Sequence, residues 1–279
     1  MSKTIHGLSA VLFFCISLLF GCNTSKPAIN ATKNEILPYK FYQILKDSIT
    51  GDRQRISVIE LDQRGKKAWH PAIGYEVKKL KPTSDFGTDP AVIAAINGSF
   101  FDRDHGGSVT YMEQGGETID TTRKYGIKWA FPKELINGAV VLDLKGQLRI
   151  EPAKTDAEYE RSKKENAVLV SGPLLLFHTR ETSMPDNKFV NKRHPRTCLC
   201  TTESSILLVT IDGRSKKAMG MNLYEARDLL KSLGCIDAIN LDGGGSTTMW
   251  TKRSGIMNMP SDPSGERDVA NAILIIRNQ

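Results

Sequence analysis

A carboxylate, three glycines and three hydroxyl side chains stand together in residues 240–248, at the end of an apolar segment that begins at Ile236. The apolar segment favours a strand, which delivers Asp242 into the polar loop. Consecutive glycines can adopt positive φ and let a ligand approach the backbone, whereas a simple tight turn needs only one or two. The composition therefore predicts a site for a small ligand. Its candidate residues are Asp242, Gly243, Gly244, Gly245, Ser246 and Thr247.

The N-terminal segment indicates an exported protein with a lipid anchor. Lys3 and His6 precede an apolar run over residues 8–20 that is too short for a spanning helix. The run ends in a sequence that resembles the lipobox of bacterial lipoproteins, with Cys22 as the acylated residue. We expect a signal peptide at 1–21, a flexible tether at 22–37 and a domain at 38–279. The expected location is the bacterial cell envelope, periplasmic or surface-exposed, with the membrane as a partner through the lipid.

Composition and charge narrow the classes of protein further. The chain has 279 residues and a formal net charge of +7, and the part after the tether fits one domain with a single large core. Its basic residues are dispersed, as is typical of solvated surface. Export is expected and no nucleic-acid-binding motif occurs, so nucleic acid is not expected as a partner.

Three cysteines remain after the expected tether. Cys198 and Cys200 alternate along a predicted strand and therefore face the same side, and Cys235 follows a predicted helix. An oxidising compartment permits one disulfide to Cys235, and the spacing does not choose its partner. Buried free thiols are the slightly preferred interpretation. A zinc site is not predicted, because no histidine lies at a matching spacing.

Periodicity predicts many strands and few helices. Residues 221–233 form a helix pattern with one apolar face, in which Asn222 and Glu225 make a capping box and Gly234 ends the helix. A strand, helix, strand unit within a chain rich in strands predicts an α+β fold, a single domain with a large mixed β-sheet core and a few helices. The predicted strands cover residues 55–61, 91–96, 139–144, 205–211, 236–241 and 272–276.

From Asn97 to its end the chain resembles the catalytic domain of the phosphodiester glycosidases, a family with members that remove N-acetylglucosamine from a phosphodiester-linked mannose. Seven matching segments follow the family's order. Departures occur after Arg196, where Cys198-Leu199-Cys200 replaces small residues, and at Asn222, where threonine is commoner. The matching segments are residues 97–102, 171–175, 194–197, 211–214, 220–223, 240–248 and 265–271.

The resemblance implies cleavage of a bond between a sugar and a phosphodiester. This reaction must stabilise an oxocarbenium-like centre, and its phosphate leaving group is already a weak base. Asp242 is the first choice as nucleophile or electrostatic stabiliser, and a turn cap is the alternative for it. Asp212 lies in an Asp-Gly pair, which is also a strong turn signal. The catalytic candidates in the matching segments are Asp242, Asp102, Asp212 and Glu266.

Phosphate recognition needs fixed donors, and arginine offers a planar fork that suits it. Arg196 and Arg267 are the candidates, although Arg267 could instead form an ion pair with Glu266 or Asp242. Asn97 and Ser171 are candidate contacts to sugar or phosphate, and the glycine-loop amides can form an anion-binding nest. His194 next to a proline is interpreted as a turn residue and is left out of the catalytic set.

These observations predict a hydrolase that cleaves a sugar-1-phosphodiester bond, similar to an N-acetylglucosamine-1-phosphodiester, in an extracytoplasmic glycan or wall polymer. Two alternatives stay open, namely a glycan-binding lipoprotein without turnover and a transglycosidase that uses the same residues. No cofactor and no metal ligand is assigned. A hard-cation site for calcium or magnesium, built from the four candidate carboxylates, stays open as well.

Overall fold

A computed structural model describes residues 37–46, 53–64, 68–123, 133–162 and 164–278. The predicted signal peptide and Cys22 lie outside these residues. From Leu37 onward the chain forms one compact unit. Within the described ranges, no helix is both long enough and apolar enough to cross a membrane.

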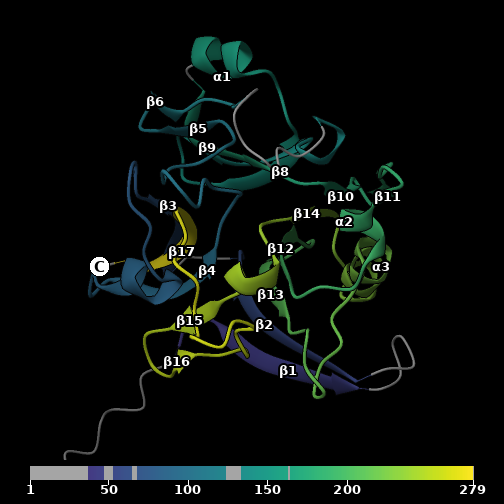
Figure 1. Cartoon of the computed structure of the whole chain (residues 1–279). Coiled ribbons are helices and arrows are strands. Elements are labelled where there is room, and N and C mark those ends of the chain that lie inside the picture. The colour runs from purple at the N-terminus through teal and green to yellow at the C-terminus, as the bar shows by residue number, and fades with distance from the viewer. Residues whose placement is uncertain (1–36, 47–52, 65–67, 124–132, 163, 279) are drawn as a thin grey trace, which may run out of the picture. The chain divides into compact units, whose positions relative to one another are not determined.

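The described strands form three antiparallel sheets (Figure 1). In spatial order, the seven-stranded sheet consists of β1 (Lys40–Lys46), β2 (Gln54–Asp62), β13 (Ser205–Ile211), β12 (Arg196–Thr201), β14 (Asp237–Asn240), β10 (Leu174–Phe177) and β11 (Arg180–Glu181). The second sheet consists of β16 (Gly255–Ile256), β15 (Met249–Thr251), β4 (Val92–Asn97), β17 (Asn271–Arg277) and β3 (Trp69–Tyr75). The third consists of β6 (Glu117–Asp120), β5 (Met112–Gln114), β9 (Glu165–Ser171), β7 (Gly138–Asp143) and β8 (Leu148–Pro152).

Few helices accompany these sheets, which confirms the predicted α+β class. All six predicted strands are present, with ends within one residue of the expected ones. The helices in the described ranges are α1 (Asp156–Ser162), α2 (Lys188–Asn191) and α3 (Leu223–Ser232), with 3-10 turns at Thr83–Gly87, Lys133–Leu135 and Gly244–Ser246.

The expectation of one mixed sheet is corrected to three antiparallel ones. The reason lies in the unit β13, α3 and β14. Strand β12 pairs antiparallel with both β13 and β14 and lies between them. The strands before and after α3 therefore run in the same direction without being neighbours, so that no parallel pair forms.

The core follows from the two-residue alternation of buried strands. In β13, Leu207, Val209 and Ile211 belong to the apolar cluster that includes the buried face of α3. The alternate residues Ile206 and Leu208 belong to the central cluster, which contains residues from all three sheets. Both faces of the seven-stranded sheet are thus covered, which explains the fully apolar character of its inner strands.

Helix α3 begins and ends as the sequence predicts. The Asn222 side chain accepts from the Glu225 backbone N–H, and the Glu225 side chain accepts from the Asn222 backbone N–H, which completes the capping box. Gly234 follows the helix with a φ of +80°.

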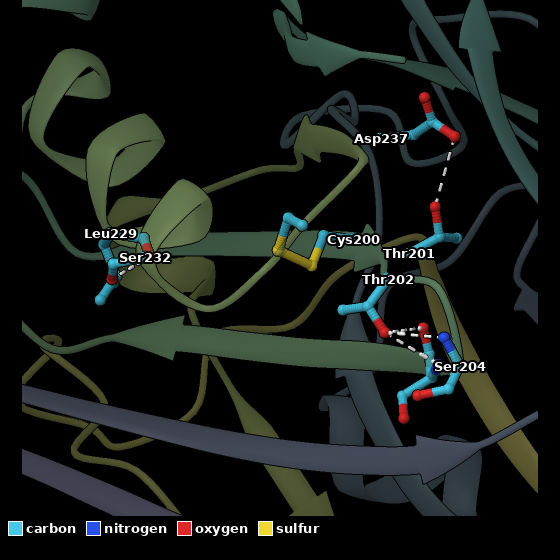
Figure 2. Close-up of a disulfide and its surroundings, with 9 residues drawn as sticks. Cys200, Thr201, Thr202, Ser204, Leu229, Ser232 and Asp237 are labelled. Carbon is cyan, nitrogen blue, oxygen red and sulfur yellow. Dashed lines mark hydrogen bonds between the residues drawn. A yellow bond between two sulfur atoms is a disulfide. The ribbon is translucent and has the colours of Figure 1, made fainter. Parts of the chain in front are cut away.

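A disulfide joins Cys200 of β12 to Cys235, which follows α3 (Figure 2). The slight preference for free thiols was therefore wrong for these two residues, and the sequence had left the pairing open. Cys198 is a buried free thiol, and burial raises its pKa to about 12. Beside the disulfide, Thr201 donates to the Asp237 carboxylate at 3.4 Å.

Candidate active site

The antiparallel order brings the candidate segments to one edge. Strand β12 runs opposite to β13 and β14, so its first residue, Arg196, lies opposite Ile211 at the end of β13. The end of β14 is at the same edge, because β12 pairs with it too. In the second sheet, β4 ends where β17 begins. The backbone N–H of Asp242 donates to the carbonyl of Gly98 at 2.9 Å, which joins the loops after β14 and β4.

A cavity of about 360 Å³ opens where these loops meet. Its lining contains one carboxylate and four arginines among the described residues, and no lysine. This charge suits an anionic ligand. The lining residues are Arg103, Phe189, His194, Arg196, Arg214, Asp242, Gly243, Gly244 and Arg267.

Asp242 is the carboxylate in this lining, and its backbone is fixed on both sides. Asn97 Nδ2 donates to the Asp242 carbonyl at 2.7 Å, and the Gly243 N–H donates to Asp242 Oδ1 at 2.9 Å. Burial raises the pKa of Asp242 to about 6. The Ser246 side chain and the charge of Arg267 favour the ionised form and oppose this rise. The carboxyl is therefore mostly ionised at neutral pH and holds a proton below pH 6.

The glycines of the loop make room for two arginines. Gly244 has a φ of +65°, and a Cβ there would come within 2.9 Å of Arg214 Nη2. A Cβ on Gly245 would collide with the guanidinium of Arg267. Bare backbone at these two positions lets both guanidiniums lie against the loop.

Ser246 and Thr247 lie behind the cavity wall. Both are buried, and neither is part of the lining. The hydroxyl oxygens of both side chains are buried and have no hydrogen-bond partner among the described residues. Direct ligand contact by these two side chains stays a prediction.

Arg196 enters the cavity from a buried position. Its Nε donates to the Met221 carbonyl at 3.0 Å, and its Nη2 donates to the carbonyls of Phe189 and Lys192 at 2.7 and 3.0 Å. The guanidinium also lies 4.9 Å from the Phe189 ring centroid. Burial lowers the Arg196 pKa to about 10, so the group stays charged at neutral pH. Because carbonyls hold it and no carboxylate among the described residues does, its charge is available to a ligand.

Arg267 also lines the cavity, but its charge is balanced. Its Nε and Nη2 lie 2.9 and 2.7 Å from Asp262 Oδ2. Arg267 thus forms an ion pair, as the alternative interpretation expected, but its partner is Asp262 and is neither Glu266 nor Asp242.

Four lining residues were absent from the predicted set: Arg103, Phe189, His194 and Arg214. Arg214 ends the matching segment 211–214, His194 begins segment 194–197, and Arg103 directly follows segment 97–102. Their position at the ends of matching segments was the available signal. Phe189 carried no such signal.

His194 and Arg214 form a pair in the cavity wall. Arg214 Nη2 lies 3.4 Å from His194 Nδ1. Burial, together with the charges of Arg196 and Arg214, lowers the pKa of His194 to about 4. The imidazole is therefore neutral at pH 7. With Nδ1 as the acceptor for Arg214, the proton of the neutral ring is on Nε2.

Asp102 does not line the cavity. Its Oδ2 lies 2.6 Å from Arg123 Nη1, and its Oδ1 accepts from the backbone N–H groups of Asp104 and His105. Burial opposes ionisation, but these hydrogen bonds outweigh it and hold the pKa of Asp102 below its usual value. This carboxylate closes the turn that carries Arg103.

Asp212 does not reach the cavity lining either. It is buried, accepts from Asn258 Nδ2 and the Met259 N–H, and lies 3.4 Å from Arg55 Nε. Burial raises its pKa to about 6. Asp212 anchors the segment 258–259 beneath the site.

Glu266 accepts from the backbone N–H of Ser84 at 3.0 Å and is not part of the lining. Of the four candidate carboxylates, the cavity thus contains only Asp242. Within the described ranges, no group of three or more histidine, cysteine, aspartate or glutamate residues could hold a metal ion. The hypothesis of a cation site built from the four carboxylates is corrected accordingly.

Asn97 and Ser171 support the loop from below. Asn97 is fully buried, and its Oδ1 accepts from Thr197 Oγ1 at 2.7 Å and from the Thr248 N–H at 3.1 Å. Ser171 Oγ donates to the Asn240 carbonyl at 3.3 Å. Neither residue is part of the cavity lining, and their predicted contacts to sugar or phosphate stay predictions.

The fold and the cavity define an α+β protein with an arginine-rich site around one carboxylate. The sequence model of the phosphodiester glycosidase family matches residues 90–276, and the chain belongs to this family.

Several known proteins share parts of this sequence. The N-acetylglucosamine-1-phosphodiester alpha-N-acetylglucosaminidase of Bos taurus is 29% identical over 167 residues, which cover 60% of this chain and 26% of that protein. The Mus musculus protein of the same name is 36% identical over 77 residues, 27% of this chain and 14% of that protein. The uncharacterized prophage-derived protein YomE of Bacillus subtilis is 39% identical over 59 residues, 21% of this chain and 9% of that protein. The chain thus matches about a quarter or less of each relative's length.

Solved structures share the fold. The catalytic domain of the zebrafish N-acetylglucosamine-1-phosphodiester alpha-N-acetylglucosaminidase, auto-inhibited by its pro-peptide, superposes with a TM-score of 0.67 at 18% identity, over 88% of this chain and 86% of that one. A hypothetical protein from Synechocystis superposes with a TM-score of 0.58 at 15% identity, over 86% of this chain and 62% of that one.

Proposed function

We propose that this chain is a hydrolase that cleaves a sugar-1-phosphodiester bond, similar to that of an N-acetylglucosamine-1-phosphodiester, in an extracytoplasmic glycan or wall polymer. The observation that carries the proposal is one cavity that combines a single carboxylate with four arginines. Membership of the phosphodiester glycosidase family supports the same chemistry.

The charges fit the two ends of the breaking bond. The leaving phosphate is a weak base, so it needs charge stabilisation and no proton donor. Arg196 is held rigidly by three carbonyls and suits the phosphate oxygens. Gly243 and Gly244 line the same cavity, and their N–H groups donate to Asp242 Oδ1 and to the Pro195 carbonyl, so the arginines and not these two amides bind the phosphate. A second carboxylate as general acid is not required for this leaving group.

Asp242 supplies the negative charge for the sugar end. An ionised carboxylate beside the anomeric carbon stabilises the oxocarbenium-like transition state, as nucleophile or as electrostatic partner. The hydrogen bond from Asn97 to its carbonyl and its own bond to Gly98 restrict where the carboxylate can move. A fixed carboxylate serves catalysis better than a mobile one.

The location belongs to the same proposal. The disulfide between Cys200 and Cys235 is typical of proteins outside the cytosol. Together with the lipobox-like sequence before Cys22, it supports a lipid-anchored protein of the bacterial cell envelope.

Release of free sugar from UDP-N-acetylglucosamine and from methyl-phospho-N-acetylglucosamine tests the activity. We expect turnover by the unmodified protein and a loss of at least about 100-fold in kcat for Asp242→Asn, since removal of a group that acts in the transition state commonly has effects of that size. Asp228→Asn, an exposed aspartate on α3, is the matched control and should leave kcat unchanged. Full activity of Asp242→Asn would remove this residue from the mechanism. No release from either substrate would contradict this sugar specificity.

A further inference from the structure

The cavity carries more positive charge than is needed to balance the negative charge of the phosphodiester that we propose as its target. Asp262 neutralises Arg267, which leaves Arg103, Arg196 and Arg214 against the single charge of Asp242. A phosphodiester brings one further negative charge. One guanidinium in the lining then remains without an anionic partner when such a group is bound.

Burial separates the unpaired arginines into two kinds. Arg196 is almost fully buried and held by carbonyls at the inner wall. Arg103 and Arg214 are exposed although they line the same cavity. We call Arg103 and Arg214 the rim pair. Neither of them forms an ion pair with a carboxylate in the part of the chain that the structure describes, although the charge of Arg103 acts on Asp242, so both offer a charge to a ligand.

The backbone holds both members of the rim pair in place. Arg214 has a φ of 59°, a rare conformation for a residue with a side chain, and its guanidinium lies against Gly244. The neighbouring His194 is neutral and leaves the charge of Arg214 unbalanced. Arg103 follows Asp102, whose carboxylate binds two backbone N–H groups of the turn and the guanidinium of Arg123.

We propose that the rim pair forms an outer anion subsite that binds a second phosphate group of the substrate, beyond the phosphate joined to the sugar that is released. This inference rests on the proposed function and specifies its substrate class. Arg196 binds the first phosphate at the inner wall, and Arg103 and Arg214 bind the second at the mouth. Arg103 directly follows the matching segment 97–102 and was not among the predicted site residues.

Two kinds of molecule carry such a second phosphate. In a nucleoside diphosphate sugar it follows the first directly. In a polymer of phosphate-linked sugars it belongs to the next repeat. Both present the same chemistry to the rim pair, and they differ in the spacing between the phosphates.

Binding of inorganic anions to the full-length protein tests the subsite without turnover. Calorimetry with phosphate and with pyrophosphate gives a ratio of two dissociation constants for each variant. We expect a ratio of at least about tenfold in favour of pyrophosphate, and a fall of roughly tenfold in that ratio for Arg103→Gln and for Arg214→Gln, since each removes one charged contact. Arg253→Gln, an exposed arginine in the turn between β15 and β16, is the control and should keep the ratio. A ratio that is the same in all four proteins overturns the subsite.

Turnover identifies the source of the second phosphate. The substrates are methyl-phospho-N-acetylglucosamine, UDP-N-acetylglucosamine and a two-repeat oligomer of phosphate-linked N-acetylglucosamine. We expect kcat/KM to be at least about tenfold higher for one of the two-phosphate substrates than for the methyl compound, and this preference to shrink in Arg103→Gln. Preference for the nucleotide sugar indicates a diphosphate, and preference for the oligomer indicates a polymer.

The two experiments keep the two proposals apart. Equal kcat/KM for all three substrates contradicts the outer subsite and leaves the hydrolase intact. No turnover of any substrate, with a pyrophosphate preference that depends on Arg103, contradicts the hydrolase and supports the subsite.

Discussion

At the scale of single residues, the environment of Asp242 sets the conditions under which the site works. Burial raises its pKa to about 6, while His194 in the same cavity has a pKa of about 4. Above its pKa His194 stays neutral up to neutral pH, so Asp242 is the member of this pair that changes its charge in that range. The protonation state of one carboxylate therefore controls the charge of the cavity near neutral pH.

The pH dependence of kcat/KM follows from this. An ionised Asp242 is required, so we expect activity to fall about tenfold per pH unit below 6 and to reach a plateau above it. Asp212 has a similar pKa but lies outside the cavity, so the rising limb near pH 6 should persist in Asp212→Asn. A profile that is flat between pH 4 and 7 would contradict the role of Asp242.

The glycine loop allows a second test at the same scale. In Gly245→Ala, the new Cβ takes the space of the Arg267 guanidinium and of Asp262 Oδ2, and this ion pair must leave the loop. We expect Gly245→Ala and Arg267→Ala each to lower kcat/KM by about tenfold, because the charge of Arg267 favours the ionised form of Asp242. The double variant should lose no more than Arg267→Ala alone, because both changes remove the same contact. Losses that multiply would show that Gly245 acts independently of Arg267.

At the scale of elements, the strands were predictable and their partners were not. Strand β13 is buried on both faces, and its continuous apolar sequence gives its boundaries directly. The pattern contains no information on which strand lies beside it. Strand β12 lies between β13 and β14, and this long-range pairing turned the expected mixed sheet into an antiparallel one.

The same pairing explains which candidates reach the cavity. Of the predicted site residues, Asp242, Arg196 and Arg267 line the cavity with Gly243 and Gly244, and their role in a site stays a prediction. Asp102 and Asp212 also follow strands, but their side chains bind the turn and the neighbouring segment instead. Side-chain direction beyond a strand end depends on contacts between sheets, which a sequence pattern does not contain.

The disulfide between β12 and the end of α3 provides a prediction at this scale. It closes a loop with a sequence separation of 35 residues and restricts the unfolded chain. We expect Cys200→Ala/Cys235→Ala to lower the free energy of unfolding by about 2–4 kcal/mol, measured by urea denaturation. Neither cysteine lines the cavity, so kcat/KM should stay the same. Cys198→Ala, the buried free thiol on the same strand, is the control and should retain the stabilising effect of the disulfide. Equal stability with and without the disulfide would contradict this account.

At the scale of the whole molecule, we propose that a lipid anchor at Cys22 determines where the site meets its substrate. The proposed anchor at Cys22 is separated from the first strand by the predicted tether. The proposed anchor would keep the domain close to the membrane. Wall polymers or surface glycans are then the substrates within reach.

Cys22→Ser tests this arrangement. Without the thiol no lipid can be attached at this position, which removes the proposed membrane anchor. We expect the unmodified protein to partition into the detergent phase and to incorporate labelled fatty acid, and Cys22→Ser to do neither. Cys198→Ala is the matched control, because its thiol is buried in the domain and should leave both properties unchanged.

Cys22→Ser should also retain the kcat of the unmodified protein on methyl-phospho-N-acetylglucosamine, since a small soluble substrate reaches the cavity without the anchor. Its activity on isolated cell walls should fall, because the enzyme is no longer concentrated at the envelope. Fatty-acid labelling of Cys22→Ser at the level of the unmodified protein would show that the lipid is attached elsewhere.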